Sequence, residues 1–225
     1  MSTSESKKTK KPCKILSQEC IGTDIYSMWL DAGEIGKNAV PGQFVSLYSR
    51  NGGKLLPRPI SLCEIDKAEG KLRLVYRVTG KGTGTEEFSR LHAGVPIETM
   101  GPLGNGFPLD AVKGKKVFLM GGGIGIPPML ETAKQLDAEK IMVLGYRDEL
   151  FLNKEFEAYE MSMWQQKTAL QEQREMLWMP SVRTILRQMR SLPADLPRCS
   201  VPSRHMPLKK EFRAGSPWKS VWPVA

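Results

Sequence analysis

The sequence predicts two units in series, an antiparallel β-barrel followed by an α/β unit. Residues 12–107 contain short apolar runs separated by glycine and proline turns, which is typical of a closed barrel. From Lys115 onward the pattern changes to strand, glycine turn, helix and strand, which predicts a βαβ unit with a buried parallel sheet. The 225 residues are enough for two such units.

The barrel strands are indicated by period-2 alternation. In KLRLVYRV (71–78), Leu72, Leu74 and Tyr76 share one face, so an apolar face is expected to line the barrel interior. GQFVSLY (42–48) and VPIETMGPLG (95–104) predict further strands. One helix is predicted within TGTEEFSRLHAG (83–94), with Thr85 as its N-cap and Gly94 at its end.

The α/β unit begins with the apolar strand KKVFLM (115–120), followed by the glycine-rich turn GGGIGI. The helix is expected to start at Pro127 or Pro128, because proline at the first helical turn sacrifices no hydrogen bond. Glycines let backbone N–H groups approach an anion, so the turn favours a diphosphate or dinucleotide ligand. Since the spacing is not GxGxxG, a tight turn without a ligand is the alternative.

Arg58 lies in LLPRPISL (55–62), where proline on both sides makes it a rigid candidate anion clamp. The alternative is an exposed arginine in a proline turn. Residues 75–85 end a strand in a Gly/Thr-rich turn, a second candidate phosphate site. GPLGNGF (101–107) is interpreted as a hinge between the units.

Four motifs in this order resemble the ferredoxin reductase superfamily, and most specifically the electron transfer subunits of class 1B, NAD-dependent dihydroorotate dehydrogenases. The resemblance covers roughly residues 12–159 and rests on RPIS (58–61), YRVTGKGT (76–83), GPLGNGF (101–107) and GGGIGIPP (121–128). It implies a Greek-key FAD-binding barrel followed by an incomplete Rossmann-like NAD-binding domain.

The resemblance also implies the binding residues. Arg58 matches a position near the FAD diphosphate, and Ser61 a position near the isoalloxazine. The remaining positions match further FAD contacts (Pro59, Ile60, Val75, Tyr76, Arg77, Gly82 and Thr83) and the NAD side of the site (Gly121, Gly122, Gly123 and Gly125). No acid, base or nucleophile is required for this positioning role, so no catalytic residue and no metal ligand is assigned.

Members of this family pass electrons from the FMN of a partner catalytic subunit, through a 2Fe–2S cluster, to FAD and then to NAD, within a heterotetramer that serves pyrimidine biosynthesis. The cluster uses four cysteines near the C-terminus. Here the four cysteines, at 13, 20, 63 and 199, show no metal-ligand spacing, so free thiols in a cytoplasmic protein are expected. No apolar run reaches membrane-span length, and no membrane association is expected.

The resemblance ends after Tyr159. Residues 160–225 hold one of the 21 glycines, four of the five tryptophans and no tyrosine. We hypothesise that this segment is read out of frame: a one-nucleotide shift lets MSMWQQKT encode a strand with an acidic turn, and lets PWKSVWPVA encode MEVCMACG, which is similar to the family's cluster motif. A divergent tail is the alternative. If the hypothesis holds, the chain is defective in electron transfer to a partner.

The predicted division is a disordered basic tail (1–11), the FAD-binding barrel (12–109), the first part of the NAD-binding domain (112–159) and an atypical tail (160–225). Residues 161–225 carry 11 basic and 4 acidic side chains, which account for +7 of the chain's net charge of +9. The rest of the chain is therefore almost neutral, and no nucleic-acid partner is expected. The alternatives to an electron transfer subunit are a stand-alone NAD(P)H-flavin reductase and a non-catalytic protein that binds through its basic tail.

Overall fold

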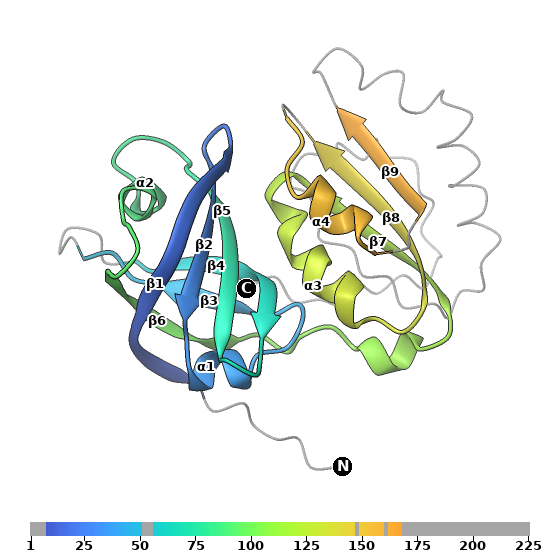
Figure 1. Ribbon diagram of the computed structural model, residues 1–225, viewed down its shortest axis with the longest axis horizontal. Helices are drawn as coiled ribbons and strands as arrows, with labels where there is room; N and C mark the ends of the chain where they lie inside the picture. Colours follow the sequence, from blue (N-terminus) through green and yellow to red (C-terminus); the bar gives the residue numbers. More distant parts are fainter. Residues whose placement is uncertain (1–7, 51–55, 147–148, 160–161, 168–225) are drawn as a thin grey trace, which may run out of the picture.

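The computed structural model describes residues 8–50, 56–146, 149–159 and 162–167. These residues form a β-barrel and an α/β unit that lie side by side (Figure 1). The expected tail after Lys167 and the expected frame shift lie outside the described residues, apart from the short segment 162–167.

Six strands close the barrel in the order β1-β2-β5-β4-β3-β6, and every neighbouring pair is antiparallel. Strands β3, β4 and β5 are successive neighbours and β2 lies beside β5, which is the Greek-key arrangement that was predicted. The strands are β1 Thr9–Gly22, β2 Ile25–Asp31, β3 Phe44–Leu47, β4 Arg58–Asp66, β5 Lys71–Arg77 and β6 Pro96–Leu103.

The barrel interior is filled by the apolar face of each strand. Leu72, Leu74 and Tyr76 of β5 are buried in this core, which confirms the period-2 prediction. The Tyr76 ring stacks on Tyr26 of β2, with 5.9 Å between the ring centroids. The opposite face of β5 is also covered, because the α/β unit packs against it.

The barrel starts earlier than the sequence indicates. Residues 9–11, assigned to the basic tail, lie in β1 and pair with β6 from Thr9 opposite Gly101 to Lys11 opposite Thr99. The lysine-rich composition suggested a solvated tail, but alternate lysine side chains on a two-faced strand can point to solvent. That part of the predicted boundary was therefore wrong.

Two short helices decorate the barrel, α1 (Glu34–Lys37) and α2 (Gly84–Ser89). The N-cap of α2 is Thr83, whose hydroxyl accepts a hydrogen bond from the Glu86 N–H at 3.2 Å. The cap was predicted at Thr85, which instead lies buried in the first turn. Alternating threonine and glycine residues offered two candidate caps, and only tertiary packing distinguishes them.

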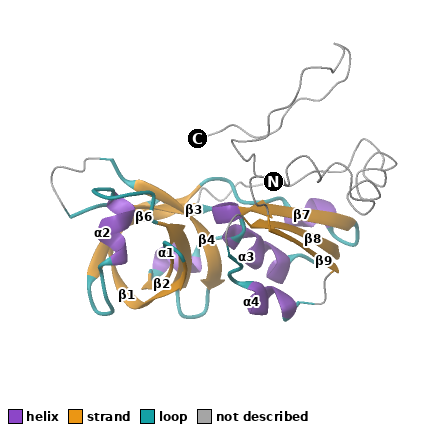
Figure 2. Cartoon of the chain, turned by 90° about the horizontal axis from the view of Figure 1, so that it is seen from above, coloured by secondary structure: helices purple, strands orange, loops and turns teal. Residues whose placement is uncertain are grey.

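The α/β unit has a three-stranded parallel sheet in the order β7-β8-β9. Helices α3 and α4 lie on the same face of this sheet (Figure 2), and α3 also contacts β4 of the barrel. The elements are β7 Lys116–Gly122, α3 Pro127–Gln135, β8 Glu139–Tyr146, α4 Asn153–Glu157 and β9 Ser162–Lys167, with 3-10 turns η1 Leu109–Val112 and η2 Gly123–Gly125.

Strand β9 extends the sheet beyond the predicted boundary. Sequence analysis assigned everything after Tyr159 to an atypical tail, yet Ser162–Lys167 pairs in parallel with β8, from Ser162 opposite Ile141 to Lys167 opposite Tyr146. Backbone hydrogen bonds to an existing strand edge do not depend on side-chain identity, so a segment without a recognisable pattern can still add a strand.

A second core joins the two units. It contains buried residues of β7, α3, β8 and α4 together with Ile25, Cys63 and Val75 from the outer face of the barrel. The α/β sheet is thus packed against the barrel through α3 and α4. Among the described residues, no helix combines the length and the apolar character needed to cross a membrane.

Candidate functional site

The predicted cofactor residues of the barrel gather at one end of it. Strands β4 and β5 are antiparallel, with Leu62 opposite Leu74 and Asp66 opposite Lys71. The start of β4, at Arg58, therefore lies near the end of β5, at Arg77. Helix α2 follows directly after the loop that leaves β5, so the three predicted segments meet in one region.

Arg58 and the start of α2 are in direct contact. A Cβ built on Gly84 would lie 3.1 Å from Arg58 Nε and 3.2 Å from its Cγ, so an added methyl group would require this arginine to shift by a few tenths of an ångström. Among the described residues the Arg58 guanidinium forms no ion pair, and it donates a hydrogen bond to the Leu56 carbonyl oxygen at 3.3 Å. A half-buried arginine without a carboxylate is suited to holding an anionic group.

The other predicted barrel residues differ in accessibility. Pro59, Ser61 and Gly82 are exposed, while Arg77 and Thr83 are half-buried, so their side chains or backbone can reach a ligand. Three predicted residues, Ile60, Val75 and Tyr76, are buried in the two cores. Their side chains hold the strands in place, and a ligand can meet them only through the backbone.

Tyr76 illustrates this distinction. It is 1% exposed, and its hydroxyl donates to Gln18 Oε1 at 3.0 Å. Burial raises the pKa of the Tyr76 phenol well above its ordinary value, with a smaller contribution from Tyr26. Tyr76 is thus a neutral structural side chain at the edge of the candidate site.

Gln18 is a supporting residue that sequence analysis missed. Its Nε2 donates to three carbonyl oxygens at the end of α2, at 3.0 Å (Phe88), 3.1 Å (Ser89) and 2.7 Å (Leu91). Together with the Tyr76 bond, these contacts fix α2 to β1 and β5. A polar residue in the middle of a predicted strand carries no local signal for such a long-range role.

The loop before α2 is closed by its own polar groups. Thr83 Oγ1 donates to the Gly80 carbonyl oxygen at 2.7 Å, and the Gly82 N–H donates to the Glu86 carboxylate. Glu86 is in turn paired with Arg90 at 2.7 Å. The Gly82 N–H, which sequence analysis assigned to a candidate phosphate site, therefore already donates to the Glu86 carboxylate.

The glycine turn of the α/β unit links β7 to α3. Gly121 is buried, Gly122 is exposed, and Gly123 and Gly125 are half-buried within the 3-10 turn. Gly123 has φ +51°, a conformation that other residues rarely adopt. Because Pro127 and Pro128 have no N–H and the Met129 N–H bonds to the Ile126 carbonyl oxygen, backbone donors for a ligand must come from the glycine turn.

The structure brings this turn to the barrel end of the candidate site. Cα atoms of Gly123–Gly125 approach those of β5 within 8 Å. Ile126, directly after the turn, shares the second core with Val75 of β5. Val75 and Gly121, which are 46 residues apart in the sequence, therefore belong to adjacent regions of the structure.

The segment 101–107 is bonded to the barrel. Its first residues complete β6, and the rest is pinned to the loop before β3: Gln43 Nε2 donates to the Gly104 carbonyl oxygen at 2.8 Å, and the Phe107 N–H donates to the Pro41 carbonyl oxygen at 2.8 Å. Gly106 packs closely against Val40 and Pro41 of the same loop, and a hinge between the units stays a prediction.

The cysteines of the described residues do not form a cluster site. Cys13 and Cys63 are buried and Cys20 is exposed, and burial raises the pKa of both buried thiols. No group of three or more histidine, cysteine or acidic side chains with metal-binding geometry occurs in the part of the chain that the structure describes. Cys199 lies outside that part.

Comparison with known proteins agrees with this architecture. Residues 12–107 match the family model of the oxidoreductase FAD-binding domain. An electron transfer subunit of dihydroorotate dehydrogenase B (NAD(+)) from Lysinibacillus sphaericus (strain C3-41) is 42% identical over 152 residues, 64% of this chain and 58% of the relative. The corresponding subunit from Streptococcus thermophilus (strain ATCC BAA-491 / LMD-9) is 45% identical over 136 residues, 59% of this chain and 52% of the relative.

The chain thus spans between half and three fifths of the length of these curated relatives. One similar solved structure is that of an NADH-dependent reduced ferredoxin-NADP oxidoreductase, which was described in connection with flavin-based electron bifurcation. It superposes on this chain with a TM-score of 0.63 at 25% sequence identity. The superposition covers 76% of this chain and 64% of the other chain. The closed barrel, the adjoining α/β unit and these matches agree: residues 12–107 are similar to oxidoreductase FAD-binding domains, and the chain is similar to the electron transfer subunits of dihydroorotate dehydrogenase B.

Proposed function

We propose that the chain binds FAD at the end of the barrel formed by Arg58, Ser61 and Arg77, and binds NAD at the glycine turn Gly121–Gly125. The observation that carries this proposal is the position of Arg58, a half-buried guanidinium without an ion pair among the described residues, fitted against Gly84. This environment is suited to the diphosphate of a dinucleotide. When bound, FAD supplies the redox chemistry, and the chain supplies position and charge.

Each predicted segment has a distinct role in this proposal. Arg58 holds the diphosphate, and Pro59 and Ile60 fix the start of β4 so that Ser61 faces the isoalloxazine. The backbone of Val75 and Tyr76, with the Arg77 side chain, forms the second wall. Gly82 and Thr83 form the third segment, where a phosphate would displace the Glu86 carboxylate from the Gly82 N–H.

We further propose that the chain, like these relatives, is an electron transfer subunit, and that it carries electrons from dihydroorotate oxidation in an FMN-containing partner subunit to NAD, in the cytoplasm. The proposal includes no dihydroorotate site in this chain. A 2Fe–2S cluster does not fit the described cysteines, so no step through a cluster is assigned to them.

Titration calorimetry with FAD tests the proposal. We expect the purified chain to bind FAD, and Arg58→Ala to weaken binding about 10-fold to 100-fold, in line with the loss of a charge-assisted contact. Lys37→Ala is the charge-matched control, because Lys37 is an exposed cation on α1 that pairs with Glu34. Absence of binding to the unaltered chain, or equal affinity in both variants, contradicts the proposal.

Activity assays separate the alternatives. Oxidation of NADH by the FAD-loaded chain with a soluble acceptor, unaffected by the FMN-containing subunit, favours a stand-alone reductase. Electron flow that depends on that subunit supports the electron transfer role. If the frame-shift hypothesis holds, the chain binds FAD, contains no iron, and does not exchange electrons with the partner.

A further inference from the structure

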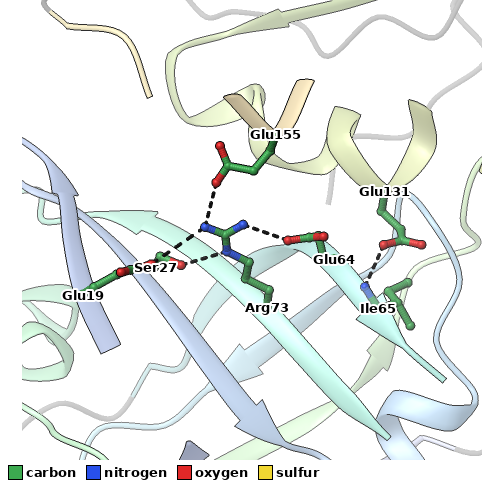
Figure 3. Close-up of polar contacts among 7 residues, drawn as sticks. All are labelled: Glu19, Ser27, Glu64, Ile65, Arg73, Glu131 and Glu155. Atoms are coloured by element: carbon green, nitrogen blue, oxygen red, sulfur yellow. Dashed lines mark hydrogen bonds and ion pairs between the residues drawn. The ribbon is translucent and has the colours of Figure 1, made fainter. Parts of the chain in front are cut away.

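A buried ion-pair network centred on Arg73 connects the two units (Figure 3). Arg73 belongs to β5 and is 7% exposed, on the face of the strand directed away from the barrel core. Its Nη2 lies 3.1 Å from Glu155 Oε1, which belongs to α4. An arginine of the barrel is therefore bonded to a carboxylate of the α/β unit.

The barrel orients this guanidinium by itself. Nη1 donates to Glu64 Oε2 on β4 at 2.8 Å, and Nε donates to Ser27 Oγ on β2 at 2.9 Å. These two bonds fix the planar group and leave Nη2 directed at α4. Glu19 Oε1, on a largely exposed side chain, lies 4.0 Å from Nη2 and adds a weaker attraction. The Glu155 carboxylate can therefore bond to Arg73 only from the side on which Nη2 lies.

A second polar contact joins the units at α3. The Ile65 N–H of β4 donates to Glu131 Oε2 at 2.7 Å, and Glu131 is 1% exposed (Figure 3). Gln135 donates to the other oxygen of the same carboxylate. Both helices that cover the sheet are therefore held against the barrel by directional bonds, which are buried at Glu131 and partly exposed at Glu155.

The electrostatics favour one arrangement of the units. Burial alone would lower the pKa of the Arg73 guanidinium, but its bonds to Glu64 and Glu155, with attraction from neighbouring groups, raise it above the ordinary value. If α4 moved away, the Arg73 guanidinium would lose Glu155 as a partner while the barrel kept it partly desolvated, which is unfavourable.

We propose that Arg73 is a positioning residue that fixes the orientation of the α/β unit on the barrel. Because Gly123–Gly125 lies against the same strand, β5, this orientation also sets the distance between a flavin at the barrel end and a nicotinamide at the glycine turn. This second clause rests on the proposed function. The step it governs is transfer of a hydride from reduced FAD to NAD⁺, which reoxidises the flavin and gives NADH, and such transfers depend steeply on distance and alignment.

Hydrogen exchange tests the orientation in the chain without any cofactor. The Ile65 amide reports on the interface, because its acceptor belongs to α3. We expect Glu155→Gln and Arg73→Met each to accelerate exchange of this amide at least 10-fold, with little further change in the double variant. Glu139→Gln, which removes one carboxylate from an exposed pair with Lys116, is the matched control and should leave the rate unchanged. An unchanged Ile65 rate in Glu155→Gln overturns the proposal even if Arg73→Met does not fold.

Rapid mixing tests the consequence for the reaction. With FAD-loaded protein and NADH, which drives the same step in reverse, we expect Glu155→Gln to lower the limiting rate of flavin reduction at least 10-fold, with unchanged FAD affinity and unchanged half-saturating NADH. Arg73→Lys should retain part of the rate, since one ammonium group can satisfy one carboxylate. Equal limiting rates overturn the positioning role. If the unaltered chain binds no FAD, the proposed function and the claim about the flavin–nicotinamide distance fail together. The hydrogen-exchange experiment still decides whether Arg73 fixes the orientation of the units.

Discussion

Arg58 Nε lies 3.1 Å from the point where a Cβ on Gly84 would stand. Replacing Gly84 by alanine therefore requires the arginine to shift by a few tenths of an ångström, while the new residue, at the first position of α2, favours the helix. We expect Gly84→Ala to weaken FAD binding about 10-fold, equivalent to about 1.4 kcal/mol, with little change in thermal stability. Calorimetry with FAD and thermal unfolding measure the two effects.

Gly122→Ala is a matched control for that variant, because a Cβ on Gly122 meets nothing within 4 Å and its φ is −124°. It should leave FAD affinity unchanged. If Gly84→Ala binds FAD as tightly as the unaltered chain, Arg58 does not contact the cofactor in the manner proposed.

Replacing Gln18 by alanine should loosen α2. Its Nε2 donates to three carbonyl oxygens at the end of that helix and its Oε1 accepts from Tyr76. Leaving these buried groups without partners should lower the free energy of unfolding by about 2 kcal/mol and weaken FAD binding as well. Urea unfolding checks the first effect. Lys134→Ala, on an exposed residue of α3, provides the control.

The approach of α1 to the β4–β5 hairpin predicts a larger stability effect. A Cβ on Gly36 would lie 2.4 Å from the Gly70 carbonyl oxygen, a backbone atom that cannot rotate away. We expect Gly36→Ala to lower the free energy of unfolding by about 3 kcal/mol, since either α1 or the hairpin must move. A loss below about 1 kcal/mol in urea unfolding would show that this contact relaxes easily.

Stability should fall at alkaline pH because of buried tyrosines. Burial, with repulsion from Glu155, raises the pKa of Tyr146 to about 12, and its hydroxyl bonds to Asn153 and Phe151. Below the unfolded-state pKa of about 10 both states are neutral and the contribution to stability is complete. As pH rises from about 10 towards 12 only the unfolded chain ionises, so stability falls by about 2 kcal/mol or more.

Urea unfolding between pH 8 and 11 measures this loss. Tyr146→Phe should flatten the slope, although it also removes the two hydrogen bonds and so lowers stability at pH 8. Part of the slope should remain, because burial raises the pKa of Tyr76 as well. An equal slope in Tyr146→Phe would contradict the assignment.

The sequence predicts those parts of the fold that follow from local periodicity. The alternation of Leu72, Leu74 and Tyr76 correctly identifies the barrel face of β5, and the two prolines correctly place the start of α3. Sequence analysis predicted nothing that would cover the opposite face of β5, yet Arg73 and Val75 are buried there. Periodicity separates the two faces of a strand, but it does not reveal that a second unit covers the outer one.

The same distinction applies to the candidate site. Sequence analysis could single out Arg58 because proline on both sides is a local signal, whereas Gln18 and Glu155 act on residues far away in the sequence. Strand β9 was missed for another reason, since pairing with the edge of β8 relies on backbone groups that every residue carries. The residues that sequence analysis omitted are those whose role exists only after folding.

The participation of Ile25, Cys63 and Val75 in the second core limits how freely the two units can recombine. A chimaera that transplanted the α/β unit onto an unrelated barrel would expose the inner sides of α3 and α4 unless the acceptor supplied equivalent apolar side chains in register. Moving the α/β unit from one barrel to another would therefore require the outer surface of β2, β4 and β5 to be moved with it.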